Sequence, residues 1–458
     1  MKKINLLIFF LFLLIWACRK DTDIFIPYEE VPSVSSFVTG AVGGAIINEF
    51  GIPQANATVK LETKTNVEEM MTDENGIFYF RNVEINAERT YLLIESESYG
   101  NSSRAFTPRE SGTEFLKIQL MTPSILDSIS ATQGGLFDVV GGASVAIPAN
   151  ALVNNGGSPF TDAANIGARY FNPVFNNLVT QLPGTLMALN SNNEQRALAT
   201  FGLLDFELAS IDGEPIQLAA DKKATLRFPI PDELMDNSPA FIPMWYFDES
   251  TGWWMEEGQA EKDGTYYIGE AGQAKLWTVA MSYNPIRMSA SIAISETNIS
   301  YPNAFSKLTV VDGGVCMAAY TDGAGVIDGY IPAGQVLRFE IFDECGYVVY
   351  SSEIGPLSTD IDFSEILVEA PNSNVVQVNG TLNCSGDPIT EGYVKLEFNE
   401  SSTYYFANAN GEFSTTIVAC NFDEFEITGV DLINHEISET NSYLANEVID
   451  TGGIDVCE

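Results

Sequence analysis

Short runs of alternating hydrophobic and polar residues, separated by glycine, asparagine and proline, occupy most of this 458-residue chain. Ala57–Leu61 and Leu337–Phe342 are two examples, in which apolar side chains recur at every second position. A period of two is typical of β-strands that bury one face. The pattern therefore predicts an all-β protein, and the length and 45% hydrophobic content favour a tandem array of β-sandwich modules.

The N-terminus departs from this pattern, because Lys2 and Lys3 precede an unbroken apolar run from Ile4 to Ala17. The run is shorter than the roughly 20 residues that a helix needs to cross a bilayer. A basic start followed by a short apolar run is typical of a secretory signal peptide. We therefore expect the mature protein to be exported.

The end of this leader, Ile15-Trp16-Ala17-Cys18, resembles the lipobox of bacterial lipoproteins. The resemblance implies that residues 1–17 are removed and that Cys18 carries the lipid, with residues 18–35 as a polar tether. Acidic residues at Asp21 and Asp23 resemble the signal that sends lipoproteins of Bacteroidota to the outside of the outer membrane. An ordinary secretory signal with an incidental cysteine is the alternative.

Residues 36–122 contain a strong turn signal at Asn75-Gly76, between the polar run Thr72–Glu74 and the apolar run Ile77–Phe80. Asparagine followed by glycine suits a type I′ hairpin turn, which needs a positive φ at both positions. Together with Gly51-Ile52-Pro53, the segment resembles the carboxypeptidase regulatory-like domain. The resemblance implies a transthyretin-like β-sandwich.

The same arrangement returns near the end of the chain. Gly44 and Gly76 lie 32 positions apart, and their counterparts Gly380 and Gly411 lie 31 positions apart. A repeat at such a distance indicates one module used twice. We therefore expect residues 375–458 to form a second carboxypeptidase regulatory-like sandwich.

The middle of the chain gives two further modules. Ser144–Leu152 and Ala224–Pro231 resemble parts of the β-sandwich of ankyrins and netrin receptors, which implies such a domain over residues 123–283. Some relatives of that fold cut themselves at a His-Phe-Ser site, but the corresponding place here is Lys275-Leu276-Trp277, so we expect no self-cleavage. Residues 284–374 are interpreted as an immunoglobulin-like β module.

Cysteine use fits an exported protein. Beyond Cys18, five cysteines remain, and two disulfides with one free thiol is the simplest arrangement. We predict that Cys316 pairs with Cys345 and Cys384 with Cys420, and pairing with Cys457 stays open. Zinc binding is disfavoured, because no C-x-x-C spacing occurs and His435 is the only histidine. We expect no bound metal and no cofactor.

Charge excludes one class of partner. The chain has 22 Lys and Arg against 62 Asp and Glu, a formal net charge of -40. Nucleic-acid binding depends on clustered basic residues, so nucleic acid is not an expected partner.

Catalytic motifs are missing as well. No G-x-S-x-G sequence occurs, His435 lies far from any nucleophile motif, and no P-loop or dinucleotide fingerprint is present. We therefore expect no enzyme. Binding remains, and Trp253 and Trp254 are the candidate ligand-binding residues, because adjacent positions of a strand face opposite sides and one of the two should point outward. The alternative is that these residues belong to an aromatic group, with Trp245, Tyr246 and Trp277, that packs in the core.

Together these observations predict a non-catalytic protein for adhesion or extracellular binding, attached to the outer membrane by its lipid and exposed to the exterior. Its expected partner is a polysaccharide or an envelope protein. Two alternatives stay open, a structural or assembly subunit of the cell envelope and an accessory or degenerate hydrolase.

Overall fold

The computed structural model describes residues 36–96, 99–108, 113–122, 125–175, 178–370, 373–399, 401–420 and 422–457. The predicted leader, Cys18 and the predicted tether lie outside the described residues. From Phe37 onward the chain forms one compact unit. The domain boundaries expected from the sequence therefore stay predictions, and the unit is described below by its hydrophobic cores.

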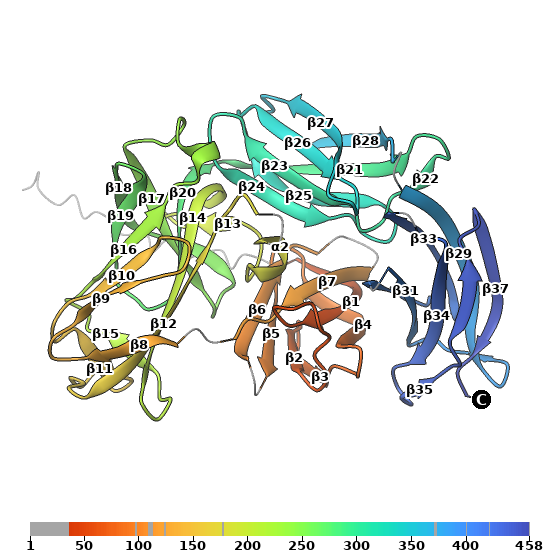
Figure 1. The fold of residues 1–458 in the computed structure, drawn as a ribbon, viewed down its shortest axis with the longest axis horizontal. Helices are drawn as coiled ribbons and strands as arrows, with labels where there is room; N and C mark the ends of the chain where they lie inside the picture. The colour runs from red at the N-terminus through yellow and green to blue at the C-terminus, as the bar shows by residue number, and fades with distance from the viewer. Residues whose placement is uncertain are drawn as a thin grey trace, which may run out of the picture. The chain divides into compact units, whose positions relative to one another are not determined.

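Almost all regular structure is β, which confirms the predicted fold class (Figure 1). The exceptions among the described residues are a single helical turn, α2 (Leu178–Gln181), and a 3₁₀ turn, η1 (Asp232–Leu234). No helix in the described ranges is long and apolar enough to cross a membrane.

The N-terminal sandwich packs a three-stranded sheet of order β4-β1-β7 on a four-stranded sheet of order β3-β2-β5-β6. Val42, Phe78, Val59 and Leu92 from the two sheets meet in its core. In the first sheet, β1 runs antiparallel to β4 and parallel to β7. The strands are β1 (Phe37–Ile47), β2 (Thr58–Glu62), β3 (Val67–Met71), β4 (Ile77–Asn86), β5 (Thr90–Ser96), β6 (Gly100–Phe106) and β7 (Thr113–Gln119).

The C-terminal sandwich repeats this topology, as the glycine spacing predicts. Strand β29 runs antiparallel to β33 and parallel to β37, and Gly380 lies opposite Phe413 just as Gly44 lies opposite Phe78. The second sheet contains β32, β31, β34, β35 and β36. The bounds are β29 (Ser373–Cys384), β30 (Asp387–Pro388), β31 (Gly392–Phe398), β32 (Ser401–Phe406), β33 (Glu412–Cys420), β34 (Glu424–Asp431), β35 (Glu436–Ile437), β36 (Asn441–Leu444) and β37 (Val448–Asp455).

The third sandwich follows the same plan. Strand β21 runs antiparallel to β25 and parallel to β28, and the facing strands have the order β24-β23-β26-β27. The strands are β21 (Pro285–Ile294), β22 (Ile299–Ser300), β23 (Phe305–Val310), β24 (Val315–Tyr320), β25 (Val326–Pro332), β26 (Leu337–Phe342), β27 (Val348–Ile354) and β28 (Ile361–Val368).

One turn recurs in all three of these sandwiches. The side chain of Asp73 accepts hydrogen bonds from the backbone N–H groups of Asn75 and Ile77, which follow it by two and four positions. The side chains of Asp322 and Asn408 accept hydrogen bonds from the backbone N–H groups at the same two spacings. Each turn contains a glycine with positive φ, and a Cβ atom on Gly76 would lie 2.4 Å from the carbonyl oxygen of Ile46. This close approach requires glycine.

The prediction of a type I′ hairpin at Asn75-Gly76 is wrong. A turn forms there, but only Gly76 has a positive φ. The flanking strands β3 and β4 belong to different sheets, so the turn passes from one layer of the sandwich to the other.

The central sandwich encloses the largest core, in which Phe206, Phe228, Tyr267 and Trp277 are fully buried. Its long strand β14 pairs with β12 and β20, and also touches β24 of the third sandwich through Thr200 and Val315. The strands are β8 (Ile125–Ser130), β9 (Gly135–Asp138), β10 (Ser144–Ile147), β11 (Leu152–Asn154), β12 (Ala163–Phe171), β13 (Met187–Leu189), β14 (Gln195–Ser210), β15 (Ile216–Leu218), β16 (Ala224–Pro229), β17 (Phe241–Asp248), β18 (Trp253–Asp263), β19 (Tyr266–Ala271) and β20 (Leu276–Tyr283).

The predicted cysteine pairs are also wrong. The disulfides join Cys345 to Cys420 and Cys384 to Cys457. Cys316 is buried in the core of the third sandwich as a free thiol, and this burial raises its pKa to about 12. Cys345 instead lies in the turn between β26 and β27, so it meets the end of β33 rather than the core.

Candidate functional site

The tryptophans singled out in the sequence do not form an exposed platform. Trp254 is fully buried beside Phe247, and its indole N–H has no hydrogen-bond partner among the described residues. Trp245 and Trp277 are also fully buried. Trp253 faces the other side of β18, as the alternation predicts, but it is only half exposed.

The outer face of Trp253 is occupied by Arg89 from the N-terminal sandwich. The Arg89 guanidinium lies 4.9 Å from the ring centre, and its Nε donates a hydrogen bond of 2.7 Å to the carbonyl of Gly252. Its Nη1 donates to the hydroxyl of Thr185 at 2.7 Å. Burial lowers the pKa of Arg89 to about 9. Trp253 is therefore part of a joint between the N-terminal and central sandwiches.

A second arginine strengthens the same joint. Arg104 donates hydrogen bonds of 2.9 Å to the carbonyl oxygens of Val179 and Thr180, at the single turn α2. Its burial lowers its pKa to about 10. The sequence contains no local signal that marks Arg89 or Arg104, because their carbonyl partners lie at distant positions in the chain.

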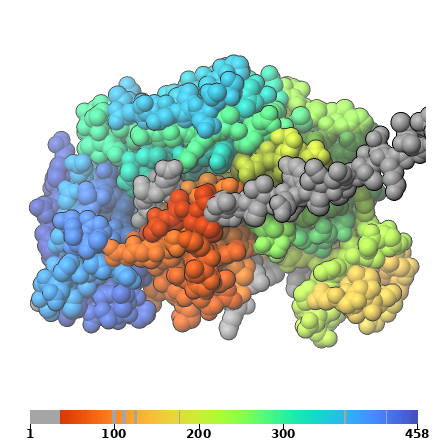
Figure 2. Space-filling view, turned by 180° about the vertical axis from the view of Figure 1, so that it is seen from behind, coloured from red at the N-terminus to blue at the C-terminus, as the bar shows by residue number. Residues whose placement is uncertain are grey.

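The N-terminal sandwich also contacts the C-terminal sandwich. The Tyr393 hydroxyl donates to Asp73 at 2.6 Å and accepts from Asn75 at 2.8 Å, so the recurrent turn of the first sandwich binds the last one. The rings of Tyr79 and Phe406 stack with their centres 4.1 Å apart. Figure 2 shows the orange N-terminal sandwich directly beside the blue C-terminal one.

The third and C-terminal sandwiches are joined covalently. The Cys345–Cys420 disulfide spans 75 positions of sequence. Between the same two sandwiches, Asn303 donates a hydrogen bond of 3.0 Å to the hydroxyl of Tyr405, and Val418 packs into the core of the third sandwich. The cysteines that we expected to stabilise single modules thus include one pair that links two of them.

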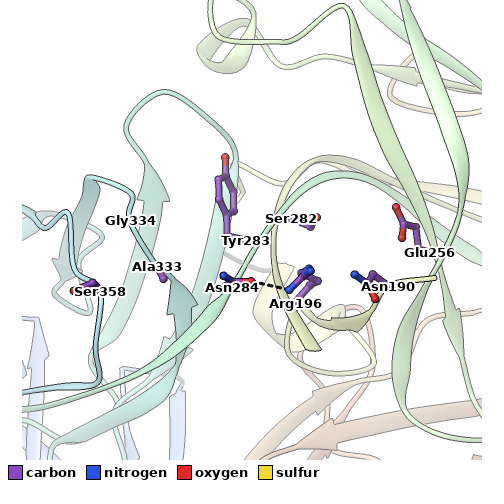
Figure 3. Close-up of a pocket in the computed structure, with 9 residues that line it drawn as sticks. All are labelled: Asn190, Arg196, Glu256, Ser282, Tyr283, Asn284, Ala333, Gly334 and Ser358. Carbon is purple, nitrogen blue, oxygen red and sulfur yellow. Dashed lines mark hydrogen bonds between the residues drawn. The ribbon is translucent and has the colours of Figure 1, made fainter. Parts of the chain in front are cut away.

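The candidate ligand site is a cleft of about 720 Å³ between the central and third sandwiches (Figure 3). Arg196 lines it and donates a hydrogen bond of 2.7 Å to the side chain of Asn284. Glu256 accepts a hydrogen bond of 2.9 Å from the backbone of Ser191. The lining is formed by Asn190, Arg196, Glu256, Ser282, Tyr283, Asn284, Ala333, Gly334 and Ser358.

The groups that line this cleft are suited to hydrogen bonding. Arg196 also pairs with Glu194, so its charge is already compensated. Among the described lining residues, Ser282 and Ser358 are the hydroxyls of nucleophile type, and neither has a histidine, lysine or second carboxylate beside it in the lining.

The carboxylates with raised pKa lie elsewhere. Burial, together with the charges of Glu207 and Glu249, raises the pKa of Asp205 on β14 to about 7. Asp205 lies opposite Arg169 of β12 and lines neither this cleft nor the shallow groove beside Asn379 and Asp450.

No family model matches the chain, and no curated protein matches it. Among solved structures, it is similar to the Bacillus anthracis TIE protein, with 9% identity, a TM-score of 0.19 and coverage of 88% of this chain and 68% of that one. It is also similar to BcpA, the major pilin subunit of Bacillus cereus, with 10% identity, a TM-score of 0.16 and coverage of 91% and 99%. At these values the likeness carries no argument about function.

Proposed function

We propose that the chain is a non-catalytic structural or assembly subunit of a bacterial cell surface, exported by its leader and held at the membrane through Cys18. The observation that carries this proposal is the set of joints between sandwiches, which contain the buried arginines Arg89 and Arg104, the Tyr393–Asp73 hydrogen bond and the Cys345–Cys420 disulfide.

These joints support a structural role because they restrict the motion of neighbouring modules relative to one another. Modules that bind ligands independently need few contacts with one another, and contacts between domains of one chain are usually polar and small. Here a disulfide and two fully buried guanidinium groups fix the contacts. A rigid multi-sandwich body at the end of a lipid tether suits a spacer or scaffold.

The test uses the full-length chain and its Cys18→Ser variant, produced in a Gram-negative host that processes lipoproteins. We expect the wild type in the outer-membrane fraction and accessible to protease added outside the cells, and the variant released from the membrane. A wild type that fractionates as a free periplasmic protein would contradict the proposed anchoring.

Extracellular binding is the second candidate, and the cleft with Arg196 and Glu256 is the observation that favours it. A glycan array probed with residues 36–457 separates the two. Absence of binding to any glycan on the array supports the structural role. Selective binding that is lost in Arg196→Met but kept in the exposed control Arg338→Met supports the binding role.

A further inference from the structure

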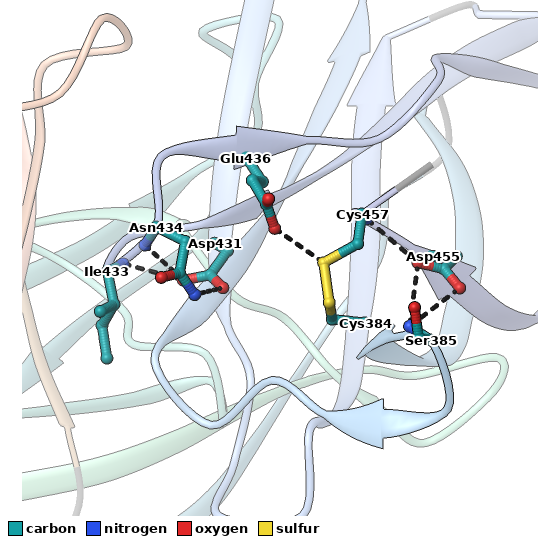
Figure 4. Close-up of a disulfide and its surroundings, with 8 residues drawn as sticks. All are labelled: Cys384, Ser385, Asp431, Ile433, Asn434, Glu436, Asp455 and Cys457. Atoms are coloured by element: carbon teal, nitrogen blue, oxygen red, sulfur yellow. Dashed lines mark hydrogen bonds between the residues drawn. A yellow bond between two sulfur atoms is a disulfide. The ribbon is translucent and has the colours of Figure 1, made fainter.

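Two cysteines and a glutamate from three separate strands meet at one end of the C-terminal sandwich (Figure 4). Cys384 is the last residue of β29, Cys457 follows β37, and Glu436 begins β35. The ligand atoms of these three residues lie within 4.8 Å of one another. Both cysteines are half buried and Glu436 is exposed, so small solutes reach the group.

The carboxylate is in direct contact with a sulfur atom. Oε2 of Glu436 lies 2.7 Å from Sγ of Cys457. In the disulfide this sulfur carries no hydrogen, so the contact is not a hydrogen bond in the oxidised protein. The contact places a carboxylate oxygen next to a sulfur atom that becomes a thiolate when the disulfide is reduced and the thiol loses its proton.

The backbone around both cysteines is held by contacts that do not depend on the disulfide. A carboxylate oxygen of Asp455 accepts a hydrogen bond of 3.0 Å from the N–H of Cys457, and the other accepts one of 3.2 Å from Ser385. The N–H of Val456 donates to the carbonyl of Asn383 at 2.9 Å. None of these bonds involves a sulfur atom, so reduction of the disulfide does not itself remove them.

The position of Glu436 is fixed by its own turn. Asp431 accepts hydrogen bonds from the backbone N–H groups of Ile433 and Asn434 at 2.8 and 3.2 Å, and pairs across the ladder with Glu436. The Asn434 side chain donates to the second oxygen of Asp431 at 2.9 Å. The turn thus fixes the backbone of Glu436, whose carboxylate lies beside Cys457.

We propose, independently of the role above, that the reduced protein binds one zinc ion through the thiolates of Cys384 and Cys457 and the carboxylate of Glu436. Zinc takes thiolate and carboxylate ligands in tetrahedral geometry, and three protein ligands leave the fourth position to water. A thiol reductant first converts the disulfide to two thiols and is itself oxidised to a disulfide. Zinc binding then releases the two thiol protons.

This group of ligands has no local sequence signal, because its members are far apart in the chain. The usual zinc signal is a pair of cysteines two to four positions apart. Here the parallel pairing of β29 with β37 brings Cys384 and Cys457 together, and the β34–β35 turn adds Glu436. The disulfide and the zinc ion are then alternative cross-links for the same two strand ends.

The test is a competition titration of residues 36–457 with zinc and a chromophoric chelator, with and without a phosphine reductant. The Cys384→Ser/Cys457→Ser variant is the reference, because it keeps the other cysteines. We expect the reduced wild type to bind one zinc ion more than the reference, and the oxidised protein to bind none at this site. Cobalt substitution should give thiolate-to-metal absorption only in the reduced wild type.

Glu436→Gln should weaken zinc binding by about 10-fold or more, because even outer partners of metal ligands have effects of this size. Glu439→Gln, an exposed neighbour, is the matched control. Peptide mapping of alkylation gives a readout that needs no variant, since bound zinc should protect Cys384 and Cys457. Equal zinc binding by wild type and reference, or an unchanged affinity in Glu436→Gln, would overturn the proposal.

Discussion

Tyr393 and Asp73 lie 320 positions apart in the sequence, and a hydrogen bond of 2.6 Å from the tyrosine hydroxyl to the carboxylate joins them. Tyr393 is fully buried, and burial together with the negative charge of Asp73 raises the pKa of its hydroxyl. The neutral phenol therefore stays a donor over the whole physiological range. The first and last sandwiches are tied by a turn that all three related sandwiches possess.

Replacing Tyr393 by phenylalanine should destabilise the protein by about 1–3 kcal/mol, because Asp73 and Asn75 lose a buried partner. Urea unfolding of residues 36–457 measures the change. Tyr347→Phe is the matched control, since Tyr347 is 62% exposed. Equal midpoints for the two variants would show that the hydrogen bond contributes nothing.

Two glycines of the first sandwich allow the stability cost of a side chain at positive φ to be compared with the cost of a steric clash. Gly51 and Gly76 both have positive φ, but a Cβ atom on Gly51 meets nothing within 4 Å, whereas one on Gly76 would lie 2.4 Å from the Ile46 carbonyl. We expect Gly51→Ala to cost about 1 kcal/mol and Gly76→Ala clearly more. Thermal unfolding of the two variants checks the order, and a larger loss in Gly51→Ala would contradict the close approach.

The protein should gain stability as pH falls from about 8 to 5, through the carboxyl group of Asp205. Burial raises its pKa to about 7, above the ordinary value of 3.8, so the folded state binds more protons than the unfolded state between these values. Stability from this group is therefore present at low pH and lost as pH rises through 7. Asp205→Asn should be more stable than wild type at pH 8. Its stability should not show the increase between pH 8 and 5 that protonation of Asp205 gives the wild type.

Differential scanning calorimetry at a series of pH values measures the effect. The exposed Asp221 supplies the control, as Asp221→Asn, because its side chain is 79% exposed. If Asp205→Asn follows the wild-type profile throughout, the carboxyl group at 205 is ionised as readily in the folded protein as in the unfolded chain.

Removing the Cys345–Cys420 bridge, as Cys345→Ser/Cys420→Ser, should lower stability by about 2–4 kcal/mol, since the bond closes a loop of 75 positions. Guanidinium unfolding under non-reducing conditions measures it. Removing the Cys384–Cys457 bridge, of nearly the same separation, gives the comparison. We expect the first variant, and not the second, to increase protease cleavage in the segment between the third and C-terminal sandwiches.

The strands and the repeat could be predicted from the sequence because both are local or evenly spaced signals. Alternation at Ala57–Leu61 and Leu337–Phe342 corresponds to strands β2 and β26. The matching spacing of Gly44 to Gly76 and of Gly380 to Gly411 predicted the C-terminal sandwich. The third copy was missed because Asp322 and Gly325 occupy the turn without the Asn-Gly pair, although the Asp-x-x-Gly spacing is shared with Asp73 and Gly76.

The joints and the cysteine pairs were not predictable in the same way. The partners of Arg89 are a carbonyl at Gly252 and a hydroxyl at Thr185, which carry no sequence signature. The cysteine prediction assumed bonds within modules, but Cys345 pairs between them. Trp254 was a binding candidate by residue type, and its burial follows from the side of β18 that faces the core.

The parallel pairing of first and last strands, β1 with β7, β21 with β28 and β29 with β37, has a mechanical consequence. When the two ends of such a sandwich are pulled apart, the paired strands slide along each other, and their ladder of hydrogen bonds is loaded in shear all at once instead of opening one bond at a time. Three sandwiches with this arrangement in one chain would resist tension applied along the chain better than sandwiches whose terminal strands separate one bond at a time.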